Sequence, residues 1–308
     1  MLPIFDSLNS GVSSLSHLGV IRVEGEDAAS FLHNQLTNDV LLLDSNHCRL
    51  GAYCNAKGRM QVSVVYYKRA ADEILLICRR DLLPQTIKRL SMFVLRAKVK
   101  LSDASAEYAL RGLVGDAMSD LCTDAEPWQR HMQVDGADVL TLYPALEQPR
   151  ALWIAPIGTA VPEGAVMSED EWQFGEVMSG VAWVEQATFE AFIPQMLNYE
   201  SVDGVNFKKG CYPGQEVVAR SQFRGTLKRR AFIVQSAMRL QAGQEVFSST
   251  DAAQPCGLIA QAASLEASHV AIAELQVAAT EGGSLHIGAP QGAELRLLPL
   301  PYALRDDI

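Results

Sequence analysis

The residue with the clearest chemical potential is Cys211, in the segment Asn206–Arg220 (NFKKGCYPGQEVVAR). Pro213 and Gly214 suit the second and third positions of a type II turn, because proline fixes φ and glycine readily takes a positive φ. The residues from Gln215 onward contain no helix breaker, so the segment predicts a loop that leads into a short helix. Nearby cations and a helix N-terminus both stabilise a thiolate, which makes Cys211 a candidate nucleophile or ligand-binding group.

A second interpretation of Cys211 stays open at the level of sequence. An isolated cysteine is more often a small buried hydrophobic residue than a reactive one. Gly210 and Gly214 frame this thiol tightly, however, and Lys208 and Lys209 precede it. These neighbours favour the reactive interpretation, because cations lower the pKa of a thiol.

The composition is that of a globular protein with more than one domain. The chain has 308 residues, 48% hydrophobic and 20% charged, and single cores rarely grow beyond about 250–300 residues. No stretch approaches the roughly 18 apolar residues of a membrane span, and residues 1–6 lack the features of a secretion signal. The six cysteines, at 48, 54, 78, 122, 211 and 256, show no paired spacing, which indicates a reducing compartment. We therefore expect a cytoplasmic monomer without a membrane partner.

The charge is unevenly distributed. A net charge of −10 argues against direct nucleic-acid binding, and the scattered histidines give no metal-ligand spacing, so no metal site is predicted. Residues 206–230 nevertheless carry one anion, Glu216, and seven cations: Lys208, Lys209, Arg220, Arg224, Lys228, Arg229 and Arg230. Such a patch attracts an anionic ligand, but a solvated charged linker would have the same composition.

Strands and helices alternate irregularly through about residue 200, which predicts an α+β fold rather than a doubly wound parallel sheet. β-Branched and alternating segments predict strands at 18–25, 48–55, 60–68, 73–79, 97–101, 109–114 and 151–155. Apolar residues at three-to-four spacing predict helices from 26 to about 39 and over 81–95, and a short one at 117–122. Ser168 and Glu171 form a capping box that opens a further helix, and Asp135-Gly136 predicts a hairpin.

The pattern changes after the cysteine segment. Short strand candidates follow at 232–236, 257–262, 270–277, 284–287 and 294–298, with no convincing helix between them. Regularly spaced short strands with glycine and proline between them are typical of a small barrel or sandwich. We therefore expect two domains, an α+β region over 1–225 and a β-barrel over 226–308.

The string Phe207–Glu216 (FKKGCYPGQE) resembles the K-G-C-Y-x-G-Q-E signature of the YgfZ family, which comprises folate-binding proteins related to the glycine-cleavage aminomethyltransferase. The resemblance extends to residues 192–195 and 224–225, and more weakly to 25–40 and 298–302. It implies an aminomethyltransferase-like fold, in which two interleaved α+β segments and a C-terminal β-barrel form a ring around a central cavity.

The resemblance also implies a function. YgfZ proteins support iron–sulfur cluster assembly or repair, including the clusters of tRNA-methylthiolating enzymes, so the implied partners are iron–sulfur enzymes or cluster assembly proteins. Cys211 would be the essential group. The resemblance implies that Lys208 and Lys209 lower the pKa of its thiol. The residues implied to fix the loop are Gly210, Tyr212, Gly214, Gln215 and Glu216.

Tetrahydrofolate or a folate derivative is the implied cofactor. Trp172 aligns with a folate-contacting tryptophan of the family, and a flat aromatic surface suits a pterin or aminobenzoyl ring. Arg220 and Arg224 are candidates for the glutamyl tail. The chain departs from the family at Met178, where relatives have a pterin-binding glutamate, and at His17, where they have a second aromatic contact.

A further departure concerns catalysis. Val62 and Ser63 align with an acidic pair of the true aminomethyltransferases, so we expect no glycine-cleavage activity. Two other functions stay open, namely a tetrahydrofolate-dependent aminomethyl or one-carbon transferase, and a regulatory folate-binding module in which Cys211 only packs.

Overall fold

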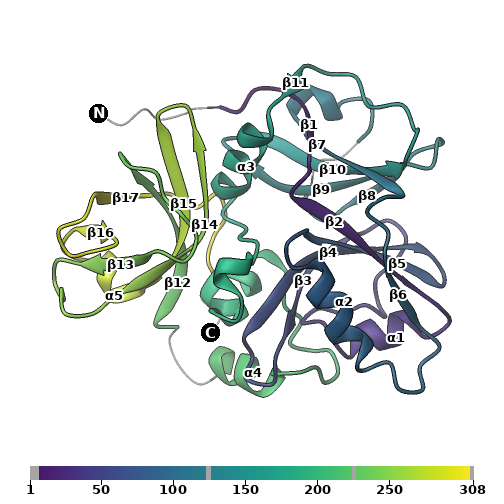
Figure 1. Ribbon diagram of the computed structural model, residues 1–308, viewed down its shortest axis with the longest axis horizontal. Coiled ribbons are helices and arrows are strands. Elements are labelled where there is room, and N and C mark those ends of the chain that lie inside the picture. Colours follow the sequence, from purple (N-terminus) through teal and green to yellow (C-terminus); the bar gives the residue numbers. More distant parts are fainter. Residues whose placement is uncertain (1–6, 123–125, 224–226, 306–308) are drawn as a thin grey trace.

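Two β-sheets and a β-barrel surround a common centre in the computed structural model, which describes residues 7–122, 126–223 and 227–305. In Figure 1 the barrel lies on the left and the two sheets lie on the right, one above the other, with α3 (Glu169–Met178) between barrel and upper sheet. This arrangement confirms the predicted α+β class and the ring of two α+β segments and a barrel.

The lower sheet is antiparallel and has the strand order β3-β4-β5-β2-β6. Its strands are β2 (Leu18–Glu24), β3 (Arg49–Cys54), β4 (Met60–Ala70), β5 (Glu73–Arg79) and β6 (Lys100–Asp103). The helices α1 (Ala28–His33) and α2 (Leu83–Ser91) pack against it. Most residues of β4 and β5 are buried, which explains why both read as nearly continuous apolar runs.

The upper sheet has the order β11-β1-β7-β10-β9-β8. Its strands are β1 (Gly11–Ser14), β7 (Tyr108–Val114), β8 (Arg130–Met132), β9 (Asp138–Ala145), β10 (Gln148–Pro156) and β11 (Val166–Met167), and the short 3₁₀ helix η1 (Gly115–Met118) follows β7. The chain begins in this sheet with β1, builds the lower sheet, and returns with β7. The two α+β segments are therefore interleaved, as predicted.

A helical segment follows the upper sheet and starts between that sheet and the barrel (Figure 1). It consists of α3, the 3₁₀ helices η2 (Gln186–Thr188), η3 (Pro194–Leu197) and η4 (Tyr199–Val202), and then α4 (Gln215–Phe223). The predicted capping box of α3 is present, since Ser168 Oγ accepts the backbone N–H of Glu171 at 3.2 Å. One core cluster joins residues of both sheets, this helical segment and the barrel.

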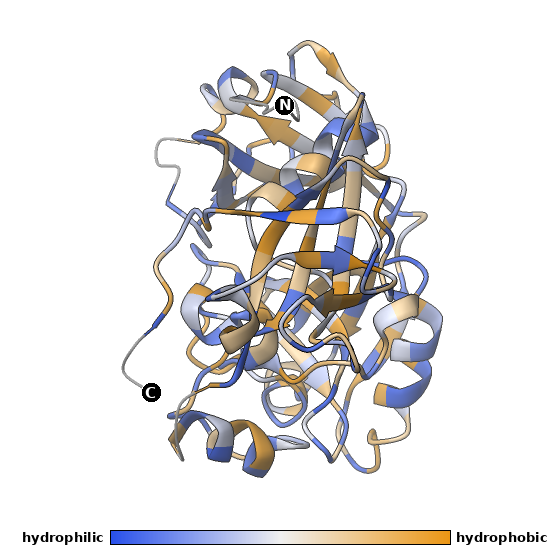
Figure 2. Ribbon diagram, turned by 90° about the vertical axis from the view of Figure 1, so that its left-hand side faces the viewer, coloured by the Kyte–Doolittle hydropathy of each residue, from blue (hydrophilic) through white to orange (hydrophobic). Residues whose placement is uncertain are grey.

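The barrel is closed in the order β12-β15-β14-β13-β16-β17. Its strands are β12 (Arg229–Ser236), β13 (Glu245–Ser248), β14 (Gly257–Leu265), β15 (Ser268–Gln276), β16 (Leu285–Ile287) and β17 (Glu294–Leu298), and one helical turn, α5 (Val277–Thr280), follows β15. Seen from the barrel side, much of these strands is hydrophobic (Figure 2). Five strands were predicted; β13 and α5 were not. The predicted division at 225/226 falls outside the described residues and stays a prediction.

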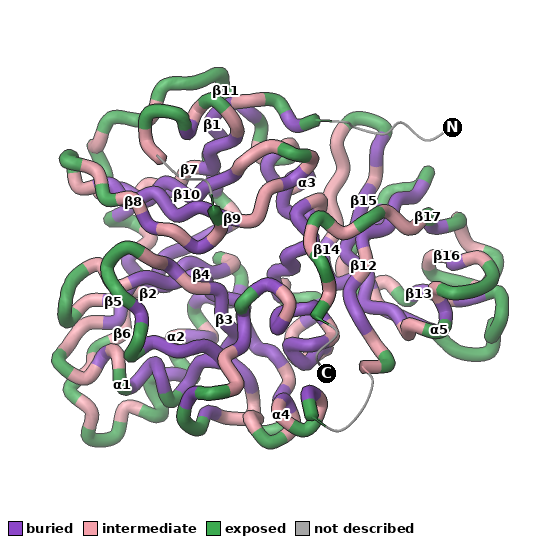
Figure 3. The backbone as a smooth tube through the Cα atoms, turned by 180° about the vertical axis from the view of Figure 1, so that it is seen from behind, coloured by how far each residue is buried: buried purple, intermediate pink, exposed green. Residues whose placement is uncertain are grey.

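The barrel packs closely on the rest of the molecule. α3 contacts β14 and β15, and η3 contacts β12. Seen from behind, most of the backbone of β12 and β15 is coloured as buried (Figure 3). No helix in the described part of the chain is both long and apolar enough to cross a bilayer.

Candidate functional site

Cys211 lies exposed on the loop that precedes α4. The predicted turn is present, because the Gln215 backbone N–H donates to the Tyr212 carbonyl at 3.1 Å and Gly214 has a φ of +80°. A Cβ at Gly214 would lie 2.5 Å from the carbonyl oxygen of Asn55, at the tip of the β3–β4 hairpin. Only glycine therefore fits this position, and the turn is built against the lower sheet.

Lys209 anchors the loop to the end of α1. Its side chain is buried, and its ammonium donates to the backbone carbonyls of His33 and of Leu36, the latter at 2.8 Å. The ammonium also lies 4.7 Å from the ring centroid of Tyr212, in a cation–π contact. These contacts hold residues 209–212 against the α1 region.

The two lysines have different environments. Burial lowers the pKa of Lys209 to about 8, although the nearby Asp39 and Cys211 oppose this shift. Lys208 is exposed, and its backbone N–H donates to Asn206 Oδ1 at 2.8 Å. The sequence predicted one role for both lysines, whereas the structure makes Lys209 an internal anchor and leaves Lys208 at the surface.

The helix α4 is held by other residues than those predicted. Gln195 Nε2 donates to the carbonyl of Val218 at 2.6 Å and so joins α4 to η3. Glu216, predicted to fix the loop, instead forms an exposed ion pair with Arg220 one turn further along α4. The role of Glu216 in fixing the loop stays a prediction, and Arg224 lies outside the described residues.

The other five cysteines are less accessible than Cys211. Burial raises the pKa of Cys48, Cys54 and Cys78 strongly, and it raises the pKa of the half-buried Cys122 to about 11. Cys256 is also buried. Exposure therefore distinguishes Cys211 from the rest.

A nearly closed pocket of about 20 Å³, the inner pocket, lies at the centre of the molecule. It is lined by Leu50, Val65, Trp128, Leu142, Tyr143, Arg150, Glu176, Ser179, Val181 and Trp183. The Glu176 carboxylate accepts hydrogen bonds from Trp172 Nε1 and Gln261 Nε2, both at 3.0 Å. The inner pocket thus has a buried carboxylate in its wall.

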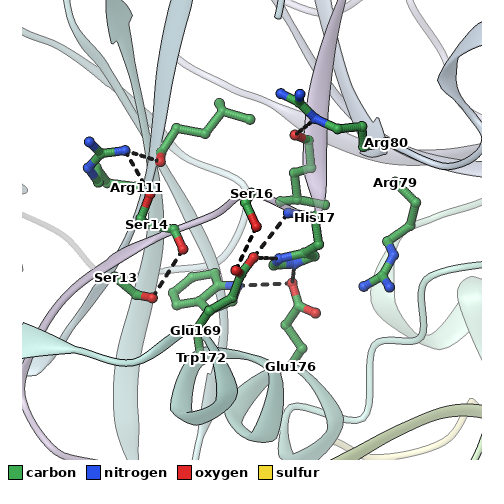
Figure 4. Close-up of polar contacts among 12 residues, drawn as sticks. Ser13, Ser14, Ser16, His17, Arg79, Arg80, Arg111, Glu169, Trp172 and Glu176 are labelled. Carbon is green, nitrogen blue, oxygen red and sulfur yellow. Dashed lines mark hydrogen bonds and ion pairs between the residues drawn. The ribbon is translucent and has the colours of Figure 1, made fainter.

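His17 lies between two carboxylates of α3 (Figure 4). Its Nδ1 contacts Glu169, and its Nε2 lies 3.3 Å from Glu176 Oε1. Burial lowers the pKa of His17 and Arg79 opposes protonation, but the two carboxylates outweigh both, so the pKa is raised overall. Burial raises the pKa of each carboxyl group, but its partners together outweigh burial and lower the pKa. These partners are His17 and Ser16 for Glu169, and His17, Arg79 and Arg150 for Glu176.

Arg150 on β10 has hydrogen-bond donors in the wall of the inner pocket that lack a partner. Its guanidinium is buried, which lowers its pKa to about 10 in spite of the nearby Glu176 carboxylate. Within the described part of the chain, its Nε and Nη2 atoms have no hydrogen-bond partner. Buried donors of this kind are costly unless a ligand or water satisfies them.

Trp172 has no free aromatic face. The guanidinium of Arg150 lies over its ring, 4.2 Å from the centroid, and a Cβ at Gly112 would lie 2.2 Å from Trp172 Cε3. Trp172 therefore presents no open stacking surface in this structure, and its contact with folate stays a prediction. Its indole N–H instead donates to Glu176, and its ring packs against the guanidinium of Arg150.

A larger groove of about 600 Å³, the outer groove, lies on the other side of Trp128. Its lining residues are Asn38, His47, Cys48, Arg49, Pro127, Trp128, Asp203, Val205, Asn206, Phe207, Lys208, Gln222, Phe223 and Arg305. Cations outnumber the single carboxylate, and Phe207 and Phe223 meet edge to face with centroids 5.8 Å apart. Trp128 lines both cavities. Arg220 lines neither of them, so the structure does not bring it together with Trp172.

Val62 and Ser63, which occupy the positions of the acidic pair, have a structural role on β4. Ser63 Oγ accepts the hydroxyl of Tyr199 at 2.6 Å and the backbone N–H of Val184 at 2.9 Å, and Val62 is buried. β4 therefore presents no carboxylate at these two positions.

Sequence reasoning missed the two charged residues of the inner pocket. Glu176 follows Trp172 by four residues, so both lie on one face of the capped helix, and a carboxylate on an otherwise buried face was the available signal. Arg150 gave no comparable signal, because its partners come from α3 and not from its own strand.

Comparison with known proteins defines the family. Residues 8–133 match the family model of the GCVT N-terminal domain. A "tRNA-modifying protein YgfZ" of Hamiltonella defensa is 30% identical over 229 residues, which cover 71% of this chain and 68% of the relative. The chain belongs to the YgfZ family. The YgfZ protein of Escherichia coli O127:H6 is 26% identical over 309 residues, covering 95% of this chain and 93% of the relative.

The fold of this YgfZ protein has a known counterpart. The crystal structure of glycine cleavage system aminomethyltransferase T from Bartonella henselae matches it with a TM-score of 0.71 at 16% sequence identity, covering 96% of this chain and 87% of that chain. The likeness establishes an aminomethyltransferase-like fold for both sheets and the barrel.

Proposed function

We propose that this protein is a folate-binding accessory factor that acts through Cys211 in iron–sulfur cluster assembly or repair, and thereby in tRNA modification such as methylthiolation. The relatives named as tRNA-modifying YgfZ proteins and the aminomethyltransferase-like fold support a folate-related role in tRNA modification. The observation that carries the proposal is the exposure of Cys211 on a turn that is fixed on several sides. A thiol in such a position is accessible to a partner protein or to a cluster.

The wall of the inner pocket offers polar groups that suit the acceptors of a folate ring. The free donors of Arg150 need acceptor atoms, which a pterin supplies, and Glu176 places a carboxylate beside them. Arg49 and Lys208 in the outer groove suit the carboxylates of a glutamyl tail better than the predicted Arg220, which is paired with Glu216. A bound folate supplies one-carbon or redox chemistry. The inner pocket must open to admit a ring, and Trp128 is the residue between it and the outer groove.

The decisive experiment replaces Cys211 in cells that lack the native copy. In cells that carry Cys211→Ser, the amount of methylthiolated tRNA and the activity of iron–sulfur enzymes under oxidative stress should equal those of cells that lack the protein. Cys122→Ser, at a half-buried thiol, should restore both to the level of the unmodified protein. Full restoration by Cys211→Ser would refute the proposed role of the thiol.

Folate binding is tested separately by calorimetry with tetrahydrofolate. Arg150→Met should weaken binding by roughly tenfold to a hundredfold, since a hydrogen bond to a charged group contributes about 1.5–3 kcal/mol. Arg111→Met on β7 is the matched control, because that guanidinium hydrogen-bonds Ser14 Oγ and lines neither cavity. Absence of saturable binding to the unmodified protein would refute the folate proposal.

The rival transferase function makes a different prediction. A transferase should form methylenetetrahydrofolate from an aminomethylated carrier protein, and it needs a carboxylate that Val62 and Ser63 do not supply. We expect no product above the uncatalysed level. Measurable turnover would favour the transferase instead.

A further inference from the structure

A chain of ionisable side chains connects the protein surface to the inner pocket (Figure 4). The Glu169 side chain is 29% exposed and is held by the Ser16 hydroxyl at 2.7 Å and by the His17 backbone N–H at 3.0 Å. The His17 ring follows it, and then Glu176, whose side chain is only 3% exposed. Carboxylate, imidazole and carboxylate therefore lie in hydrogen-bond order from solvent to the pocket wall.

Glu176, at the inner end of this chain, is fixed by hydrogen bonds to the protein. Both oxygens of Glu176 accept hydrogen bonds from the protein, one from Trp172 and the other from Gln261. A ligand can therefore bond the free donors of Arg150, whereas Glu176 has no free oxygen to offer it. Such a ligand affects Glu176 by changing the charges that surround its carboxylate.

The surrounding charges are few and can be named. Arg150 on β10 and Arg79 on β5 are the cations that face this cluster. Glu185, after α3, ion-pairs with Arg79 at 3.3 Å. When His17 is protonated, three cations balance the three carboxylates of Glu169, Glu176 and Glu185.

We propose that Glu169 passes protons between solvent and His17, whose charge balances Glu176, and that a ligand bringing hydrogen-bond acceptors to Arg150 is taken up together with a proton. The ligand part rests on the proposed folate function, whereas the relay itself does not. The proton enters from solvent at the Glu169 carboxylate and forms the second N–H bond of the His17 ring. No bond of the ligand breaks.

The direction of this coupling follows from charge balance. An acceptor group on the ligand engages the guanidinium of Arg150, which otherwise balances Glu176. Protonated His17 then has to balance Glu176, so ligand binding favours the protonated ring. Affinity should therefore be highest at low pH and should fall by up to about tenfold per pH unit above the titration of His17.

The relay can be tested without a ligand, because the indole N–H of Trp172 donates to Glu176 and reports its surroundings. The indole resonance, assigned with Trp172→Phe, should titrate with a midpoint above 6.5, the ordinary pKa of histidine. His17→Gln should abolish this titration, and Glu169→Gln should lower the midpoint, because one anion is removed. His269→Gln in β15 is the control and should change nothing.

Two results would overturn the relay. One is an indole resonance that does not titrate between pH 5.5 and 9.5, and the other is an unchanged titration in His17→Gln or in Glu169→Gln. The second variant tests the outer half of the pathway and does not depend on whether His17→Gln folds normally.

The ligand part is tested by calorimetry with tetrahydrofolate in two buffers of different ionisation enthalpy. At a pH about one unit above the midpoint of the indole titration, the unmodified protein should take up protons on binding, and His17→Gln should bind with no proton uptake. Binding without proton exchange in the unmodified protein would overturn this part while leaving the folate function intact. Absence of any binding would overturn the folate function and the ligand part together, and the indole titration would still decide the relay.

Discussion

Cys211 and Lys209 are two residues apart, yet one is exposed and the other is buried beneath the loop. The thiol is free to meet a partner because the ammonium carries the structural role, bound to two carbonyls at the end of α1. The exposed thiol and the buried anchor of the segment are thus neighbouring side chains.

Differential alkylation should identify Cys211 as the most reactive thiol. A mild alkylating agent at neutral pH should modify one cysteine rapidly in the folded protein, because the remaining five are buried or half-buried and have raised pKa values. Peptide mass spectrometry should place the fast modification at Cys211, and Cys211→Ser should remove it. Faster modification of Cys122 would contradict this assignment.

The stability of the protein should depend on pH through Lys209. Burial lowers the pKa of Lys209 to about 8, below its ordinary value of 10.5. Between these two pH values the unfolded chain binds more protons than the folded protein, so folding becomes more favourable as pH rises. The free energy of unfolding of the unmodified protein should therefore increase, relative to Lys209→Met, from pH 8 to about 10.5.

Urea unfolding at several pH values measures this difference. Lys208→Met is the control, since Lys208 is the neighbouring lysine and is exposed. The same pH trend in both variants would show that Lys209 is not the group responsible.

At the scale of elements, the turn before α4 depends on the hairpin between β3 and β4. Gly214→Ala would place a Cβ 2.5 Å from backbone atoms of that hairpin at a positive φ, so the substitution should destabilise the protein by more than about 1 kcal/mol and distort the loop. Gly158→Ala is the matched control, because Gly158 also has a positive φ but no atom within 4 Å of the added Cβ. Equal destabilisation in urea unfolding would show that the contact with the hairpin is unimportant.

Elements that have a local sequence pattern could be predicted. Elements that form only through pairing with a neighbouring strand could not. Strand β5 and the capped helix α3 were predicted because a compact aliphatic run and a capping box are local. Strands β1, β11 and β13 were missed, since they have two to four residues and exist through their neighbours in the sheets.

The same distinction holds for the candidate site. The turn at Pro213 and Gly214 could be predicted from residue types alone. The burial of Trp172 and the pairing of Arg150 with it could not, because they depend on the packing of β10 against α3. The environment of Lys209 likewise depends on a helix about 170 residues earlier in the chain.

At the scale of the whole molecule, a buried ion pair joins the barrel to the centre. Arg230 on β12 bonds Glu200 on η4, and a second nitrogen donates to the carbonyl of Arg305 at 3.0 Å. Arg230→Met should lower the free energy of unfolding by about 3–5 kcal/mol, because it leaves a buried carboxylate without its cation.

The control for this prediction is the exposed pair on α4. Arg220→Met removes a pair between exposed side chains and should cost no more than about 0.5 kcal/mol. Urea unfolding of both variants compares the two, and similar values would mean that the barrel is not fixed through Arg230.

The turn that carries Cys211 is shaped by surfaces from distant parts of the chain, namely the end of α1, the β3–β4 hairpin and η3. A synthetic peptide spanning 206–223 has none of these surfaces and should behave as a flexible chain with an ordinary thiol. Transplanting the ten-residue signature into an unrelated scaffold should fail for the same reason. A change at Gln195, whose side chain bonds α4, can therefore disturb the loop of Cys211 without altering the signature.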